Sequence, residues 1–148
     1  MGHRRKAREF AMQALYMHET VERAADALST LDWVDRDVTA DIRAFAIRLI
    51  EGSIERREYI DGLIRKHSKN WKFERISAVD KSILRISIYA MLFIPDIPLA
   101  VTINEGIELA KAYGGNNSGQ FVNGILDAIK KSERADAREP GGGSGETQ

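Results

Sequence analysis

Apolar residues recur at helical spacing along almost the whole chain. In the first stretch, Ala7, Phe10, Ala11 and Ala14 follow one another at steps of three and four, which predicts an amphipathic helix. Similar spacing continues in the stretches 21–31, 42–49 and 54–67. No segment alternates apolar and polar residues as a half-buried strand does. The pattern therefore predicts an all-α protein.

Capping residues and helix breakers mark where the first helices begin and end. Asp37 or Thr39 is suited to cap the helix that contains residues 42–49. Gly52 interrupts the apolar stripe and indicates a bend or a close helix contact. Ser77 is followed three residues later by Asp80, which is the spacing of a capping box, although Asp replaces the preferred Glu or Gln.

The second half of the chain gives the clearest helices. From residue 83 to residue 93, apolar side chains occur on nearly every face, which is typical of a central helix surrounded by others. Pro95 and Pro98 end it. The next helix runs over about 99–113 and ends at Gly114, and Asn117 or Ser118 caps the last one. In all, the pattern predicts about six or seven helices.

Length and composition indicate how many domains the chain has and where in the cell it acts. The chain has 148 residues, 43% of them hydrophobic and none of them cysteine, so one ordinary domain without disulfides is expected. We predict a helical domain over 1–132 and a disordered tail over 133–148, which has no apolar residue larger than Ala. No apolar run approaches the roughly 18 to 20 residues of a membrane helix, so we expect a cytoplasmic protein that binds no membrane.

Residues that could carry catalysis are scarce. His3, His18 and His67 lack the spacing of metal ligands, so solvated or packed histidines are the simpler interpretation. The glycine-rich "GGNNSG" is not followed by Lys and Ser or Thr, which argues against a phosphate-binding P-loop. We therefore predict no enzymatic activity, no metal and no cofactor.

Three residues inside predicted helices call for a structural explanation. Arg85 lies in the most apolar helix and Glu105 in the helix after it, so we predict a partly buried ion pair between them. Gly124 lies within the last helix, where glycine costs about 1 kcal/mol relative to alanine. This cost indicates a close backbone approach to another helix or to a ligand.

The net charge of zero hides a strongly basic start. Arg4, Arg5, Lys6 and Arg8 crowd into the N-terminal end of a helix, where the helix dipole disfavours positive charge. Folding alone does not favour this placement, whereas four cations can bind the phosphates of a nucleic acid. A solvated run of charge is the alternative interpretation.

A second candidate for nucleic-acid binding lies at the start of the last helix. Asn117, Phe121 and Asn123 place amides and an aromatic ring near free backbone N–H groups. Single-stranded RNA bases stack on aromatic rings and bond to amides. Phe121 packed in the core is the more common arrangement for a single phenylalanine.

Four segments resemble the NusB family of bacterial transcription antitermination factors. They are "RRKAREFAMQALY", "WKFERISAVDKSILRISIYAM", "IPLAVTINEGIELAKAYGG" and "SGQFVNGILD", in family order. The similarity covers nearly all of residues 3–131. It implies two packed three-helix sub-bundles and binding of the single-stranded boxA element of ribosomal RNA leader transcripts, together with NusE, a small-subunit ribosomal protein.

The resemblance also implies roles for particular residues. The phosphate contacts would be Arg4, Arg5, Lys6 and Arg8, and the residues near the bases would be Asn117, Phe121 and Asn123. Tyr16 and Asp80 would face NusE. The pair would join other Nus factors on RNA polymerase. Many family members carry an acid where this chain has Asn117, so we expect an acid there to weaken RNA binding.

Two other binding functions stay open from the sequence. The chain is also similar to the RNA-binding domain that some ribosomal RNA cytosine methyltransferases carry, although it has no catalytic cysteine. A helical protein-interaction scaffold without RNA binding would instead use the N-terminal cations against acidic protein surfaces. The sequence does not distinguish a monomer from a homodimer.

Overall fold

A computed structural model describes residues 2–21, 28, 30–34 and 38–133 of the chain. This part consists of helices and connecting turns without strands: α1 (Gly2–Thr20), α3 (Ala40–Glu55), α4 (Arg57–His67), the short 3-10 helix η1 (Phe73–Arg75), α5 (Ala78–Phe93), α6 (Leu99–Tyr113) and α7 (Ser118–Ser132). The all-α prediction is confirmed. Most of the helix predicted at 21–31, the alternative cap Asp37 and the tail beyond residue 133 lie outside the described residues.

The helix ends follow from local hydrogen bonds. The Thr39 hydroxyl accepts from the backbone N–H of Ile42 at 3.3 Å and caps α3. The Ser77 hydroxyl caps α5 in the same way, accepting from the N–H of Asp80 at 3.1 Å. At the C-terminal end of α6, the N–H of Gly114 donates to an α6 carbonyl. These ends lie where the capping residues and glycines of the sequence predict them.

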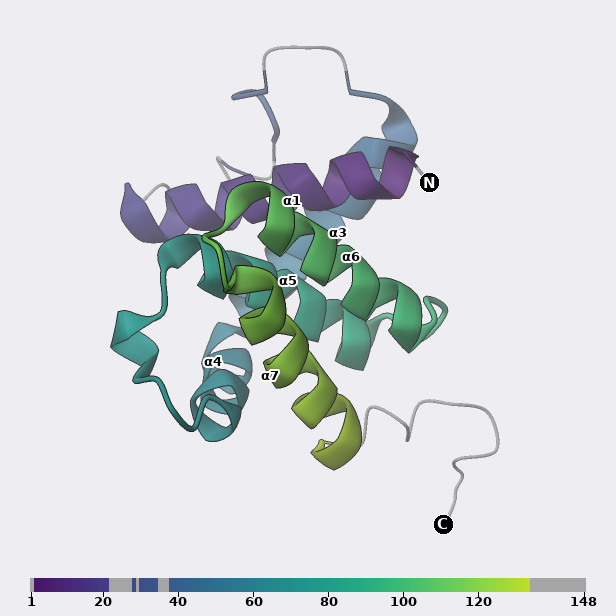
Figure 1. Cartoon of the computed structure of the whole chain (residues 1–148). Coiled ribbons are helices and arrows are strands. Elements are labelled where there is room, and N and C mark those ends of the chain that lie inside the picture. The colour runs from purple at the N-terminus through teal and green to yellow at the C-terminus, as the bar shows by residue number, and fades with distance from the viewer. Residues whose placement is uncertain (1, 22–27, 29, 35–37, 134–148) are drawn as a thin grey trace.

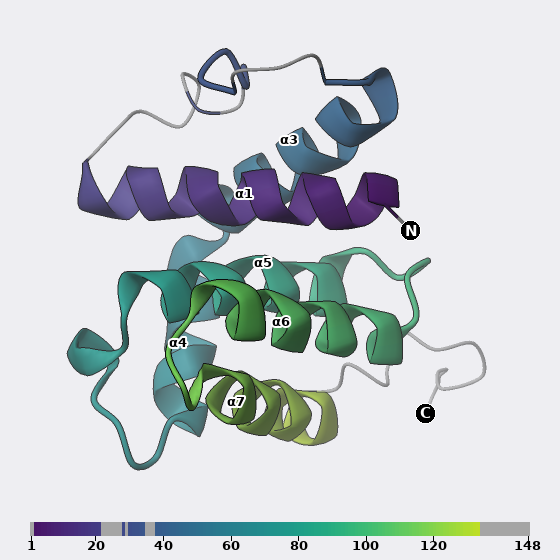
Figure 2. The same cartoon turned by 45° about the horizontal axis from the view of Figure 1, so that its top comes forward.

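Helix α5 is the centre of the molecule, as its apolar pattern predicts. Helices α1 and α3 pack side by side along one flank of α5, while α6, α7 and α4 pack around the rest of it (Figures 1 and 2). Ile83, Leu84, Ile88 and Met91 of α5 are fully buried. Because α6 lies between α1 and α7, residues from both ends of the chain border the same helix.

Two glycines behave differently from one another. A Cβ on Gly52 would overlap the ring of Tyr89, so the predicted close helix contact is confirmed. Gly124 is exposed, and a Cβ added to it would meet no atom of the described chain within 4 Å, so the close approach to another helix is wrong and the approach to a ligand stays a prediction. Gly106 makes that kind of approach instead, since its Cβ would lie 2.7 Å from Oγ of Ser87 on α5.

Arg85 forms a buried ion pair, but not with Glu105. Its guanidinium donates to both carboxylate oxygens of Asp61 on α4, at 2.8 and 3.0 Å, and also bonds to Glu19 at the end of α1. The predicted Arg85–Glu105 pair is therefore wrong. The two side chains face different neighbours: Arg85 points from α5 toward α4, and Glu105 points from α6 toward the start of α1.

The ionic network around Arg85 connects three helices that are far apart in the sequence. Burial alone would raise the pKa of Glu19, but hydrogen bonds from Arg85 and Lys81 outweigh it and the pKa is lowered. Lys81 bonds to Glu19 at 3.1 Å. Both cations also lie over the ring of Phe73. The network therefore joins α1, α4 and α5.

The last described residue, Glu133, belongs to the folded domain rather than to the tail predicted from 133 onward. Its N–H donates to the Ile129 carbonyl, and its carboxylate bonds to Lys66 at 2.6 Å and to His67 at 3.0 Å. These contacts fasten the end of α7 to the end of α4. In the part of the chain that the structure describes, no helix combines the length and apolar character needed to cross a membrane.

Candidate nucleic-acid interface

The basic start of α1 is organised by one acid on α6. Arg5 donates to both carboxylate oxygens of Glu105, from Nε at 3.0 Å and from Nη2 at 2.8 Å. The Glu105 side chain is 8% exposed, whereas that of Arg5 is 48% exposed. The hydrogen bonds from Arg5 lower the pKa of Glu105, and Glu105 raises the pKa of Arg5. This two-point contact orients Arg5 while leaving its outer face in solvent.

Arg8 was predicted to contact phosphate, but its side chain is buried. Its side chain is only 7% exposed, with Nη1 lying 3.8 Å from Glu105 and the guanidinium lying over the Phe45 ring. Burial is the main cause of the lowered pKa of Arg8. A phosphate cannot reach this guanidinium without rearrangement of the surrounding side chains. Arg8 instead packs on Phe45 and lies beside Glu105.

Arg4 and Lys6 remain accessible. Arg4 is exposed, and its guanidinium lies over the Phe45 ring, 5.1 Å from the ring centroid. Lys6 pairs with Glu9 one turn later at 3.1 Å and is 37% exposed. Exposed pairs of this kind contribute little to stability, so Lys6 can exchange Glu9 for another anion. The structure thus offers Arg4, Arg5 and Lys6 as the accessible cations of this segment.

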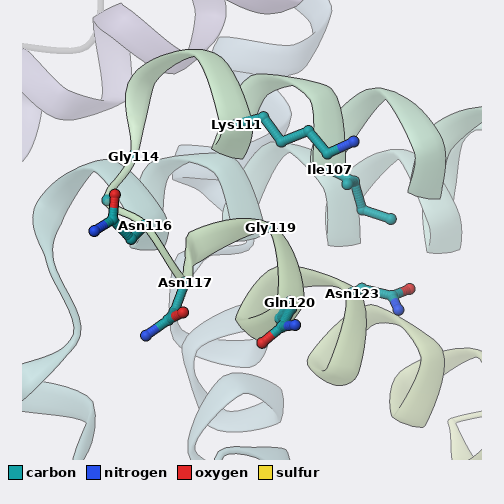
Figure 3. A pocket seen from close by; sticks show the side chains of 9 residues that line it. Ile107, Lys111, Gly114, Asn116, Asn117, Gly119, Gln120 and Asn123 are labelled. Carbon is teal, nitrogen blue, oxygen red and sulfur yellow. The ribbon is translucent and has the colours of Figure 1, made fainter.

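The loop between α6 and α7 borders a polar pocket of about 490 Å³ (Figure 3). Side-chain amides of Asn116, Asn117, Gln120 and Asn123 surround it, and Lys111 of α6 extends along its upper side. The predicted residues Asn117 and Asn123 therefore lie in one pocket. Amides and an ammonium group around a helix N-terminus are suited to the edges of bases and to phosphates.

Phe121 points to the other side of the same loop. It is partly buried and lines a second pocket of about 330 Å³ together with Trp71, Arg75 and Asp80. Asn117 lines both pockets. The loop therefore separates an amide-rich surface from an aromatic one, and Asn117 belongs to both.

Helix α6 connects the N-terminal cations to this loop. Glu105, which holds Arg5, precedes Lys111 by six residues, or about 9 Å along a helix axis. Between them Glu108 is exposed and pairs with Lys111 at 3.5 Å. The cations and the loop are thus separate patches that border one helix, close enough for one extended strand to contact both.

A third feature is an apolar groove of about 370 Å³ between α1, α5 and the end of α6. Tyr16 and Tyr113 are 40% and 42% exposed there, and Met12, Met17, Trp33 and Val79 complete most of the lining. Tyr16 is the residue predicted to face a partner protein. Asp80 borders the groove only through its neighbour Val79, because the Asp80 carboxylate bonds to Ser118 on the other side.

Sequence reasoning missed several residues of these surfaces. Lys111, Trp71 and Arg75 were not predicted to belong to them, although an exposed tryptophan among lysines in "SKNWKF" is an available signal. Within the described ranges, no group of three or more His, Asp or Glu side chains is placed to hold a metal ion. The cations, amides and aromatic rings of these surfaces suit contacts with an anionic chain.

Comparisons with known proteins identify the family of this chain. The model of the NusB family matches residues 5–131. A transcription antitermination protein NusB from Syntrophus aciditrophicus is 46% identical over 145 residues, covering 95% of this chain and 90% of that protein. The same protein from Thermodesulfovibrio yellowstonii is 42% identical, covering 88% of this chain and 93% of its own length.

Solved structures show the same fold. T. maritima NusB superposes with a TM-score of 0.79 at 40% identity, covering 87% of this chain and 91% of its own. A crystal structure of antitermination factors NusB and NusE in complex with dsRNA gives a TM-score of 0.79 at 25% identity, covering 89% of this chain and 98% of its own. Family model, relatives and fold agree, and the chain belongs to the NusB family of non-enzymatic transcription antitermination proteins.

Proposed function

We propose that this protein binds the single-stranded boxA element of ribosomal RNA leader transcripts together with NusE and acts there as a transcription antitermination factor. One observation carries the proposal: exposed cations at the start of α1 and the amide-lined loop before α7 border the same helix, α6. The cations supply affinity for phosphates, and the loop supplies groups that contact unstacked bases.

The accessible residues fall into groups that contact phosphates and groups that contact bases. Arg4, Arg5 and Lys6 contact phosphates, because their charged ends reach solvent. Asn117 and Asn123 contact base edges, and Phe121 offers part of its ring for stacking. A single strand fits these groups better than a duplex, since paired and stacked bases hide both edges and faces.

NusE is proposed to occupy the apolar groove beside Tyr16. Half-exposed tyrosines and two methionines around a shallow groove are typical of a protein-binding surface, where tyrosine often contributes strongly. A relative solved with NusE and dsRNA supports a complex that contains both NusE and RNA. Tyr16→Asp is expected to weaken NusE binding while leaving the fold intact, because the side chain is 40% exposed.

The wider assembly follows from the same family. The protein with NusE is proposed to join other Nus factors on RNA polymerase, which places it in the bacterial cytoplasm where transcripts are made. Whether it also forms a homodimer is decided by gel filtration with light scattering.

Fluorescence anisotropy tests the proposed function. Labelled boxA RNA, a scrambled strand and a boxA duplex are titrated with this protein, with and without its cognate NusE. The proposal expects boxA to bind more tightly than both controls, and NusE to increase that preference. Equal binding of boxA and the scrambled strand, unchanged by NusE, would contradict it and favour a protein scaffold.

A further inference from the structure

The loop between α4 and α5 gathers positive charge around an exposed tryptophan. Residues 65–75 contain five cations and one acid, Glu74, although the whole chain has a net charge of zero. Trp71 lies within this stretch and is 57% exposed. Because tryptophan is highly buried on average, an exposed one among cations calls for an explanation. Cations interleaved with an aromatic face are typical of surfaces that bind single-stranded nucleic acid.

The backbone of this loop is anchored on both sides of Trp71. The Trp71 N–H donates to the carbonyl of the buried Ser68 at 3.3 Å, and the Ser68 hydroxyl donates to the Trp71 carbonyl at 3.2 Å. After Trp71, the Phe73 ring packs against the Arg65 guanidinium, 4.1 Å from the ring centroid, and Ile76 is buried. Anchors of this kind reduce the entropy that is lost when a ligand orders the loop.

Three cations of the loop have no ion-pair partner among the described residues. Lys66 pairs with Glu133 at the end of α4. Lys69, Lys72 and Arg75 are exposed and pair with no acid that the structure describes. They recur at steps of three residues, on both sides of Trp71. Their combined field attracts an anionic chain and repels a basic one.

The loop continues the candidate interface beyond the α6–α7 loop. Trp71 and Arg75 line the pocket of about 330 Å³ to which Asn117 and Phe121 also belong. Figures 1 and 2 both show the segment between α4 and α5 beside the α6–α7 loop. A strand that follows α6 and leaves the α6–α7 loop on its aromatic side therefore meets Trp71 next. This continuity favours RNA over an acidic protein as the occupant.

We propose that residues 69–75, here named the Trp71 loop, bind single-stranded RNA that flanks boxA without selecting its sequence. Lys69, Lys72 and Arg75 contact phosphates of the flank, and one of its bases stacks on the Trp71 ring. Stacking tolerates any sequence because every base has a π face. The proposal rests on the proposed boxA binding: boxA positions the strand along α6, and the Trp71 loop adds affinity for the RNA on one side of it.

Strands with and without a flank test this proposal. Anisotropy, with cognate NusE present, compares boxA alone with boxA extended by a short run of uridines at the 5′ end or at the 3′ end. The same extensions made of adenosines test whether the flank sequence matters. A scrambled strand with each extension separates binding of the flank from binding of boxA. Every strand is measured over a salt series.

The expected result is a gain from one of the two extensions. At low salt, wild-type protein should bind that strand about tenfold more tightly than boxA alone, as expected for one stacked base. The slope of log affinity against log salt should increase by about 2, because each of three phosphate contacts adds about 0.7. Uridine and adenosine extensions should both give the gain.

Variants of the Trp71 loop assign the gain to its side chains. Trp71→Ala should remove most of it, and Trp71→Phe should keep most of it, because phenylalanine retains an aromatic face. Lys69→Gln with Lys72→Gln should lower the slope for the extended strand by about 1.4 more than the slope for boxA alone. Lys130→Gln with Lys131→Gln removes two exposed cations from the end of α7 and should keep the wild-type gain. Thermal unfolding shows that each variant is folded.

Other results would overturn the inference. Equal affinity for boxA alone and for both extended strands excludes a flank contact. A gain that survives in Trp71→Ala and in the Lys69 and Lys72 double variant, or that is lost equally in the control variant, does not come from the Trp71 loop. Weaker NusE binding without RNA, together with an intact gain, identifies the loop as a protein contact. If boxA and scrambled strands bind equally, the proposed function fails, whereas a Trp71-dependent gain on the scrambled strand still supports the Trp71 loop.

Discussion

Arg5 and Arg8 are three residues apart, yet their substitution is expected to have opposite consequences. Arg5 exposes half of its side chain beside Glu105, whereas Arg8 is buried over Phe45. Arg5→Gln therefore removes a phosphate contact and the two hydrogen bonds to Glu105, which keeps Arg8 as a cationic neighbour. Arg8→Gln removes a packed guanidinium and leaves the accessible cations unchanged.

The structure gives a size to each effect. Each phosphate contact on a single strand adds about 0.7 to the slope of log affinity against log salt. Three accessible cations predict roughly a twentyfold loss of affinity between 50 and 200 mM salt, against roughly fiftyfold for four. Arg5→Gln should lower the slope by about 0.7, and Arg8→Gln should leave it unchanged.

Stability is expected to follow the reverse order. Arg8→Gln loses the contact with Phe45 and the attraction to Glu105, although it also removes Nη2, which has no partner. We estimate a net cost of about 2 kcal/mol, or a fall in Tm of about 4 to 8 °C for a chain of this length. Arg5→Gln should change Tm less, because the Arg5 side chain is half exposed and Glu105 keeps Arg8 as a cationic neighbour at 3.8 Å.

Two measurements on each variant test whether Arg5 binds phosphate and Arg8 stabilises the fold. Anisotropy with boxA RNA and NusE over a salt series gives the slope, and thermal unfolding followed by circular dichroism gives Tm. Lys130→Gln, at the far end of α7, controls for the loss of one exposed charge. If Arg8→Gln lowers the slope as much as Arg5→Gln and leaves Tm unchanged, the division between accessible and buried cations is wrong.

Three further predictions follow from the fold and the loop. Arg85→Met leaves the buried Asp61 and the partly buried Glu19 without their shared cation and should cost about 3 kcal/mol in urea unfolding at pH 7. Folding lowers the pKa of Glu19, so the stabilisation by its ion pair with Arg85 is present above the unfolded pKa of about 4.3 and is lost as pH falls through the folded pKa. The stability difference between wild type and Arg85→Met should therefore shrink at acidic pH. A difference that does not change with pH would contradict this. Gly52→Ala should destabilise the protein by about 1 to 3 kcal/mol in the same unfolding assay, because the added Cβ overlaps Tyr89. The exposed Gly124→Ala should stabilise it by up to about 1 kcal/mol. Similar effects of both substitutions would refute the close contact between Gly52 and Tyr89. Asn117→Asp should weaken boxA binding about fivefold in filter binding by adding a negative charge, and equal binding would exclude a nearby phosphate.

Helix positions could be predicted from the sequence because their signals are local. Thr39 and Ser77 cap the helices that follow them, and Gly114 follows the end of α6. These residues act on backbone groups within about one turn, so no knowledge of the tertiary fold is needed. The central position of α5 was equally clear, since only a surrounded helix carries apolar residues on nearly every face.

The ion pairs could not be predicted in this way. Arg85 finds Asp61 at a separation of 24 residues, and Arg5 finds Glu105 at a separation of 100. Which cation pairs with which acid depends on how the helices are rotated against one another, and the spacing within each helix does not contain that information. The Arg85–Glu105 prediction placed both residues correctly in buried or partly buried ion pairs and matched the wrong partners.

The burial of Arg8, by contrast, had a local signal. Ala11, Met12 and Leu15 follow it at steps of three, four and seven, and all three are buried. That spacing places Arg8 at the edge of the apolar face of α1 rather than on its polar face. The run of charge in the sequence obscured this pattern, and only the fold shows that Glu105 is there to receive the guanidinium.

Mapping of the RNA contact by two-dimensional amide NMR is the most direct test of the central claim. Labelled protein is titrated with boxA RNA, and shifts are compared with those caused by a scrambled strand. We predict boxA-specific shifts at residues 4–6, at residues 111–123 and around Trp71, with residues 52–66 of α3 and α4 unchanged. Shifts that cluster on residues 52–66, or that are identical for both strands, would contradict a boxA-binding surface built around α6.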